Sequence, residues 1–77
     1  DTKIKFRIPE KNRVILEIVD IFGNNVKTLV NTELAPNRYE YIWDGYNSNG
    51  EIMSTGTYIY RLKVGDNVYS GKMSFIR

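Results

Sequence analysis

One polar stretch of the sequence carries the side chains that could hold a cation. The carboxylate and amide oxygens that calcium prefers come from Asp44, Asn47, Asn49 and Glu51. The calcium loop of helix–loop–helix proteins needs oxygen ligands at its third position and Glu at its twelfth, but a loop starting at Asp44 places Tyr46 and Thr55 there. Asp and Asn are also typical of turns, where their side chains bond the local backbone. A turn is the favoured interpretation, and a looser ion site is the alternative.

Catalytic chemistry has few candidate groups. The chain contains no His and no Cys, so no hydroxyl has an imidazole partner and no thiolate is available. A pair of carboxylates could hydrolyse glycosides, and the carboxylates include Glu17, Asp20, Glu40, Asp44, Glu51 and Asp66. A chain of 77 residues leaves little room for a deep substrate cleft. We therefore expect no enzymatic activity and no cofactor.

The elements that position these side chains are predicted to be β-strands. Apolar and polar residues alternate with a period of two, and Gly, Asn, Asp or Pro marks the breaks. The expected strands cover 3–8, 13–20, 26–30, 38–43, 55–64 and 68–76, with a short seventh at 51–53 and a bulge at Gly71. This spacing is typical of an all-β, antiparallel sandwich. We expect one domain, residues 1–77.

The aromatic residues fall at strand spacing. Tyr39, Tyr41 and Trp43 share one strand face, and Tyr58 and Tyr60 share another. Buried, these rings would fill the middle of a small sandwich, whereas exposed rings could stack on sugars. The core is the favoured interpretation, and a carbohydrate platform is the alternative.

The opposite strand faces carry aliphatic residues that could bind a partner. The pairing predicts that these point away from the main core: Ile15, Val19, Ile42 and Ile59. Together and exposed, they would form an apolar docking patch. Alternatively, the stems of neighbouring Lys and Arg side chains cover them.

Charge and hydropathy exclude two further classes of partner. The net charge is +2, and the nearest approach to a basic patch is Lys3, Lys5 and Arg7, which alternate with apolar residues as on a strand with one solvated face. Nucleic-acid binding needs more clustered cations than these, so we do not expect it. No apolar run approaches the roughly 18 residues that a membrane span needs. The start Asp1-Thr2-Lys3 shows no signal peptide, which predicts a mature fragment or an excised module.

Six short motifs occur in order along the chain. They are T-x-I-x-F at 2–6, V-x-L-x-I-x-D-x-x-G-x-x-V at 14–26, W-D-G at 43–45, Gly50, T-G-x-Y-x-Y-R-L at 55–62 and K-M-x-x-x-R at 72–77. Together they resemble the C-terminal sorting domain of type IX secretion substrates. The same pattern is shared with the flagellar hook-cap immunoglobulin-like domain.

The resemblance implies a seven-stranded immunoglobulin-like β-sandwich that is secreted or lies at the cell surface of a Gram-negative-type bacterium. It further implies a non-catalytic, C-terminal secretion-targeting module, recognised by the type IX translocon. The alternative is a structural module of a cell-surface protein or filament that joins subunits, or copies of itself, through strand edges. A carbohydrate-binding module is a third hypothesis.

The resemblance also implies roles for single residues. Trp43 would anchor the core, Asp44 and Gly45 would turn the chain, and Gly56 would let it re-enter the strand of Tyr58 and Tyr60. Asp20 would accept backbone N–H groups in the turn at Gly23, and Met73 belongs to the last motif. The recognition surface would be the final strand with Lys72 and Arg77. Asn37 stands where the family has Gly, and we expect it to adopt a positive φ.

Overall fold

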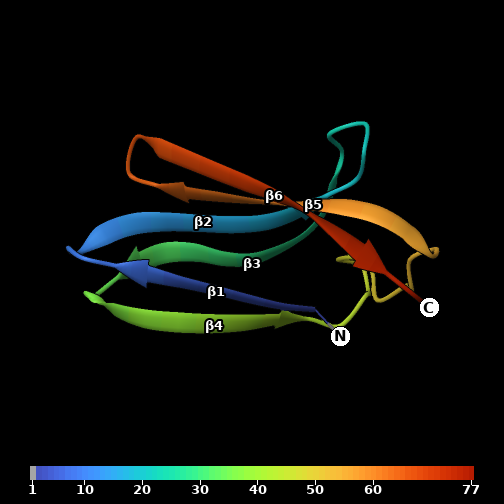
Figure 1. Cartoon of the computed structure of the whole chain (residues 1–77), viewed down its shortest axis with the longest axis horizontal. Coiled ribbons are helices and arrows are strands. Elements are labelled where there is room, and N and C mark those ends of the chain that lie inside the picture. Colours follow the sequence, from blue (N-terminus) through green and yellow to red (C-terminus); the bar gives the residue numbers. More distant parts are fainter. Residues whose placement is uncertain (1) are drawn as a thin grey trace.

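The computed structural model describes residues 2–77, which form an all-β, antiparallel fold (Figure 1). The strands in this range are β1 (Thr2–Ile8), β2 (Asn12–Val19), β3 (Asn25–Leu34), β4 (Asn37–Trp43), β5 (Gly56–Val64) and β6 (Asn67–Phe75). One sheet has the order β3-β2-β5-β6, and β1 and β4 form the other. No helix in this range is long and apolar enough to cross a membrane.

The predicted seventh strand at 51–53 is wrong. Ile52 makes only an isolated bridge with Tyr46. The loop between β4 and β5 bends back on itself because Gly45 and Gly50 adopt positive φ angles of 86° and 81°. The N–H of Glu51 bonds a side chain of this loop rather than a neighbouring strand. The smaller sheet therefore consists of two strands.

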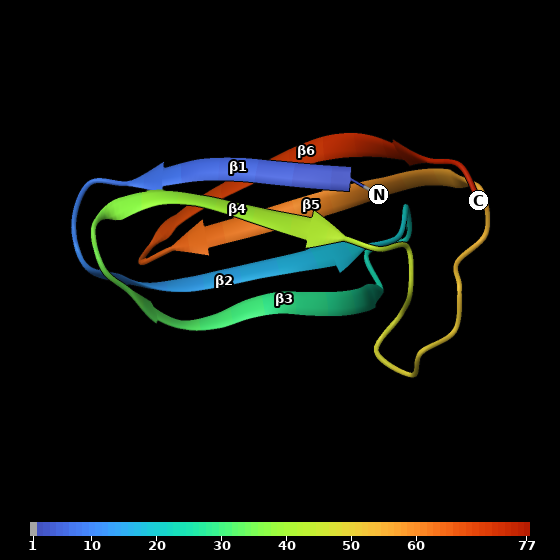
Figure 2. The ribbon, with the colours of Figure 1, turned by 90° about the horizontal axis from the view of Figure 1, so that it is seen from below.

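The two sheets pack face to face around one core. Figure 2 shows β1 and β4 in front of the larger sheet, with β3 extending beyond them. The side chains of Val14, Leu16 and Ile18 alternate inward along β2 and are fully buried. Strand β2 is paired on both sides, with β3 and with β5, so it forms the centre of the fold.

Two aromatic groups fill the space between the sheets. Trp43 is 0% exposed, and its ring lies 5.0 Å from that of Tyr58 and 5.2 Å from that of Phe75. Nearer the rim, the rings of Phe6, Tyr39 and Tyr41 stack and are partly buried. Rings of this size bury much more area than aliphatic side chains, which is how so short a chain obtains a core.

The glycines differ in what requires them. Gly71 pairs regularly with Tyr60, so the predicted bulge is wrong; a Cβ at this position would lie 2.7 Å from the hydroxyl oxygen of Tyr60. Gly71 thus gives the tyrosine ring its space. Gly56 has no positive φ, and a Cβ there would meet nothing within 4 Å, so strand re-entry does not depend on glycine there.

Two turns carry polar residues from the motifs. The carboxylate of Asp20 accepts the N–H groups of Phe22 and Asn24, both at 2.9 Å, and Gly23 adopts a φ of 85°. The expectation for Asn37 is wrong, because no described non-glycine residue has a positive φ. Asn37 instead begins β4 and accepts the N–H of Arg38 through its side chain at 2.8 Å.

Candidate functional site

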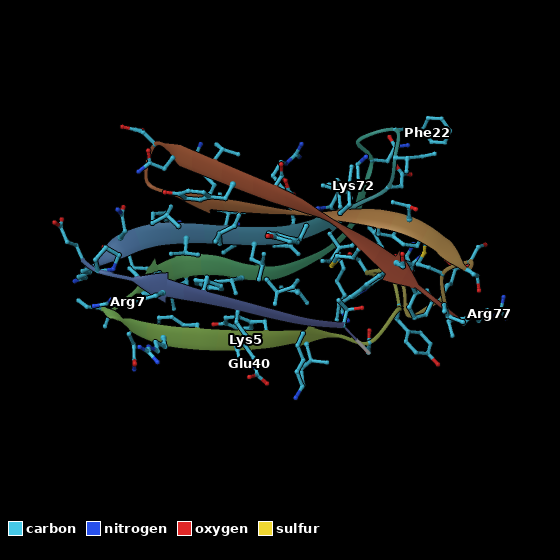
Figure 3. All side chains as sticks on the ribbon, viewed as in Figure 1. Lys5, Arg7, Phe22, Glu40, Lys72 and Arg77 are labelled. Atoms are coloured by element: carbon cyan, nitrogen blue, oxygen red, sulfur yellow. The ribbon has the colours of Figure 1, made fainter. Side chains whose placement is uncertain are left out.

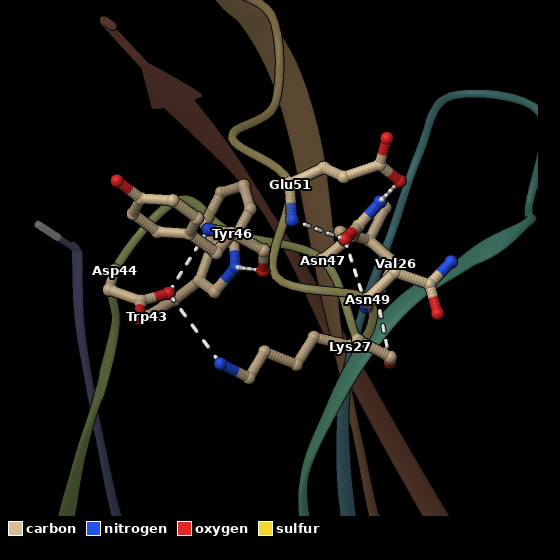
Figure 4. A network of polar contacts seen from close by, with 9 residues as sticks. Val26, Lys27, Trp43, Asp44, Tyr46, Asn47, Asn49 and Glu51 are labelled. Carbon is tan, nitrogen blue, oxygen red and sulfur yellow. Dashed lines mark hydrogen bonds and ion pairs between the residues drawn. The ribbon is translucent and has the colours of Figure 1, made fainter.

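The loop between β4 and β5 uses its polar side chains to fold itself (Figure 4). The Oδ1 atom of Asn47 accepts the N–H groups of Asn49 and Glu51, both at 2.9 Å, and its Nδ2 donates to the Glu51 carboxylate at 3.2 Å. Asp44 accepts the N–H of Tyr46 at 3.0 Å. These are the backbone-capping bonds that Asp and Asn make in turns.

The same loop is held against the sandwich from three directions. The indole N–H of Trp43 donates to the carbonyl of Tyr46 at 3.0 Å, and Ser48 donates its N–H to the carbonyl of Val26 at 3.0 Å. The ammonium of Lys27 lies 3.6 Å from the Asp44 carboxylate (Figure 4). Within residues 2–77, no three acidic side chains gather as they would around a metal ion. The geometry of Asp44, Asn47, Asn49 and Glu51 is therefore that of a pinned turn.

The aromatic side chains considered for sugar binding face inward. Trp43 and Tyr58 lie in the core, and the hydroxyl of Tyr58 donates to the carbonyl of Ser54 at 2.7 Å. Tyr39, Tyr41 and Tyr60 pack against the core from its rim. A flat sugar platform needs exposed ring faces, whereas these five rings are buried in the core or packed against it.

The four aliphatic residues expected on the outer faces do not form one patch. Ile15, Val19 and Ile59 belong to the larger sheet, whereas Ile42 belongs to the smaller one and is 50% exposed. The expectation that Val19 is exposed is wrong, because only 2% of it reaches solvent. Val19 stands opposite Ile59 beside a register shift in β2, close to the turn at Gly23.

The outer face of the larger sheet is mainly polar. The guanidinium of Arg61 bonds the Glu17 carboxylate at 2.6 and 2.8 Å, and Asn25 donates to the same carboxylate at 2.8 Å. A shallow hollow of about 330 Å³ lies over this group, between Ile15 and Val68. The Glu17 carboxylate in this hollow is thus bonded from both sides, and Lys63 is the further charged residue that lines it.

Lys72 and Arg77 are exposed, but they lie at different places on the molecule (Figure 3). Lys72 belongs to β6 and stands opposite Ile59. Arg77 follows the end of β6, and its N–H donates to the hydroxyl of Thr55 at 3.0 Å. These two cations therefore do not form one cluster.

A groove that the sequence did not indicate opens between the two sheets at the hairpin of β5 and β6. It has a volume of about 540 Å³ and is lined by Phe6 and Arg7 of β1, Leu62 and Val64 of β5, and Tyr69 of β6. Tyr69 is on the inward face of β6 but is 54% exposed, because β1 does not reach over it. Tyr69 stands opposite the buried Leu62, yet the smaller sheet leaves its ring uncovered.

A second exposed apolar feature is the tip of the turn between β2 and β3. Phe22 is 81% exposed, and Ile21 beside it is also exposed (Figure 3). The Asp20 carboxylate holds the backbone on both sides of Phe22. Such an aromatic side chain on a fixed turn is a conspicuous surface feature, and no residue pattern predicted it.

Comparison with known proteins finds one similar solved structure and one matching family. The solved structure described as FlgD from P. aeruginosa superposes with a TM-score of 0.70 and is 25% identical, over 94% of this chain and 57% of that chain. The chain thus spans little more than half the length of that protein. The comparison with curated proteins gives no match. None of these findings supports the sorting-domain half of the sequence resemblance. The sequence profile of the FlgD Ig-like domain matches residues 1–67, and the chain therefore belongs to the FlgD Ig-like domain family.

Proposed function

We propose that this domain is a non-catalytic structural module that joins subunits of a cell-surface assembly through the edges of its sheets. The observation that carries the proposal is the division of the fold into a four-stranded and a two-stranded sheet. Strands β1, β4, β3 and β6 each have a paired strand on one side only. Their unpaired N–H and C=O groups are templates for a strand from another protein.

Membership of the FlgD Ig-like domain family supports an assembly role over a targeting role. The sequence resembles flagellar hook-cap domains, and on that resemblance we propose that this domain lies at the cell surface. The polar side chains of the loop between β4 and β5 have structural partners. The loop oxygens bond the local backbone, and the buried residues of the described chain include no polar or charged side chain.

The type IX sorting role stays a prediction from the motifs. Most motif residues build the scaffold: Trp43, Tyr58 and Met73 are buried in the core, and a Cβ on Gly45 would overlap the ring of Phe75. The motifs therefore mark a fold that both kinds of domain share. They do not separate export from assembly.

A deletion in the encoding bacterium separates the two roles. We expect a strain lacking residues 1–77 to export the rest of the protein but to lose its incorporation into the surface structure, as seen by fractionation and electron microscopy. Restoring the segment should restore incorporation. Retention of the truncated protein inside the cell would favour sorting, and normal incorporation without the segment would refute the proposal.

A further inference from the structure

Strand β1 has one free edge along its whole length. Its only ladder in residues 2–77 is with β4, from Thr2 opposite Trp43 to Ile8 opposite Asn37. No other backbone hydrogen bond of the described chain involves a β1 residue. In an antiparallel pair, alternate residues direct their N–H and C=O groups away from the partner. Strand β1 therefore presents unpaired backbone groups on the side opposite β4.

Beside β1 lies an uncovered part of the core. Along β6, Tyr69, Met73 and Phe75 share the inward face, but only Met73 and Phe75 are buried. The ring of Tyr69 lines the groove together with Phe6 of β1 and Leu62 of β5. A groove lined by Phe6, Leu62 and Tyr69 beside an open strand edge is what a third strand of the smaller sheet would cover.

The outer face of the smaller sheet beside β1 is cationic. Lys3 and Lys5 share one carboxylate, that of Glu40, at 3.8 and 3.9 Å, and Lys5 and Glu40 project outward together (Figure 3). Arg7 stands opposite Arg38, so the end of the ladder juxtaposes like charges. Four exposed cations thus face a single carboxylate, and such long, exposed pairs neutralise each other weakly.

We propose that the free edge of β1 binds an extended segment of a partner protein in which acidic and apolar residues alternate. The proposal rests on the proposed assembly function and names its edge and its ligand. An added strand would lie about 4.8 Å from β1. Its inward side chains would contact Phe6 and Tyr69, and its outward side chains would stand beside Lys3, Lys5 and Arg7. Acidic residues there supply the missing counter-charge.

The groove also sets the position of the segment. Glu10 lines the groove just beyond β1, so an acidic residue of the partner at that end would be repelled. The acidic positions are therefore expected along residues 3–7 only. Five to seven alternating residues would be sufficient for this length, at roughly 3.3 Å per residue.

Two peptides test the proposal on the isotopically labelled chain of residues 1–77. One has the sequence Thr-Glu-Val-Glu-Val-Glu-Thr, and the other replaces each Glu by Lys. In an NMR titration up to about 1 mM peptide, we expect the acidic peptide to shift the amide signals of residues 3–8 and Tyr69 and to slow amide exchange in β1. The basic peptide should bind at least about tenfold more weakly, because it meets like charges.

Three variants locate the contact. Arg7→Glu should weaken the acidic peptide severalfold, and it places an opposite charge beside Arg38, so the fold is retained. Lys72→Glu makes the same change of net charge on the larger sheet and should leave binding unchanged. Tyr69→Ser removes an exposed ring and should weaken binding about tenfold at an unchanged melting temperature.

The inference is overturned by signals confined to β3 or β6, by equal binding of the two peptides, or by no binding to 1 mM. Failure of this kind is distinct from failure of the proposed function. If the deletion strain loses surface assembly while the peptides do not bind β1, the module assembles through another edge or another ligand. If assembly survives the deletion, the function itself is wrong.

Discussion

Gly45 offers the sharpest test of how the loop and the core fit together. It adopts a φ of 86°, and a Cβ there would overlap the ring of Phe75, which packs on Trp43. Gly45→Ala therefore combines two costs. The left-handed backbone costs about 1–2 kcal/mol for alanine, and forcing a methyl into a packed site costs about 1–3 kcal/mol. We expect a loss of about 2–5 kcal/mol, which is a large share of the stability of a domain this small.

Gly50→Ala is the matched control. Gly50 has nearly the same φ, 81°, but an added Cβ would meet nothing within 4 Å. This variant carries the backbone cost alone, about 1–2 kcal/mol. The difference between the two variants isolates the contact with Phe75, at about 1–3 kcal/mol.

Urea denaturation followed by the fluorescence of Trp43 measures both variants. With a slope of about 1 kcal/mol per molar urea, the midpoint of Gly45→Ala should lie about 1–3 M below that of Gly50→Ala. Phe75→Leu should cost less in the Gly45→Ala background than in the wild type, because a smaller side chain relieves the overlap. Equal midpoints for the two glycine variants would show that the loop adjusts freely, and the reasoning would fail.

Three further outcomes follow from the core and the turns. Hydrogen bonds from the backbone N–H of Asn24, and then of Phe22, hold the pKa of Asp20 below its ordinary value of 3.8. The ionised carboxylate therefore stabilises the fold above that pH, and this contribution is lost as the pH falls through the folded-state pKa. Asp20→Asn should accordingly be less stable than the wild type at pH 7 and approach it in thermal melts below about pH 3.8; a constant difference down to pH 2 would contradict this assignment. Tyr58→Phe leaves the Ser54 carbonyl without its donor at 2.7 Å and should cost about 0.5–1.5 kcal/mol in urea, whereas no loss would mean that water replaces the hydroxyl. Trp43, at 0% exposure, should emit at short wavelength and resist acrylamide until urea unfolds the chain, and efficient quenching of the native protein would place the indole outside the core.

The alternation of residues predicted the strands well because it reflects one local rule. A residue and its second neighbour share a face, so Tyr58 and Leu62 turn inward together, and Lys3 and Lys5 turn outward. Most strand ends also followed from turn residues such as Gly23, but β3 continues to Leu34, beyond the predicted end at 30. These signals are local, and the other strand bounds lie within about one residue of the prediction.

What failed depends on contacts between distant residues. The stretch 51–53 alternates like a strand, but its loop is pinned to Val26 and folded by Asn47, so it has no neighbouring strand to pair with. Val19 points outward by alternation, and nothing in its own sequence reports that it is covered. In the sequence Gly71 suggests a bulge, but in the structure the ring of Tyr60 lies against it and explains the glycine.

The candidate interface was invisible in the sequence for the same reason. The sequence indicated that Lys3, Lys5 and Arg7 lie on a solvated strand face. Whether they could bind a partner segment depends on which edge of β1 is free. That edge follows from the division of six strands into layers of four and two, and strand order is a property of the whole chain. Likewise, only the packing of β1 shows that Tyr69 is left uncovered.

The unequal sizes of the two sheets have a consequence for amide hydrogen exchange. In the described chain, β1 and β4 bond only each other through their backbones, whereas β2 and β5 are interior strands held on both sides. A ribbon of two strands is marginal alone, so the smaller sheet is held to the larger one mainly by the side chains it buries, Trp43 among them. Amide hydrogens along its free edge should exchange before those of β2 and β5, and a segment bound to that edge should slow their exchange.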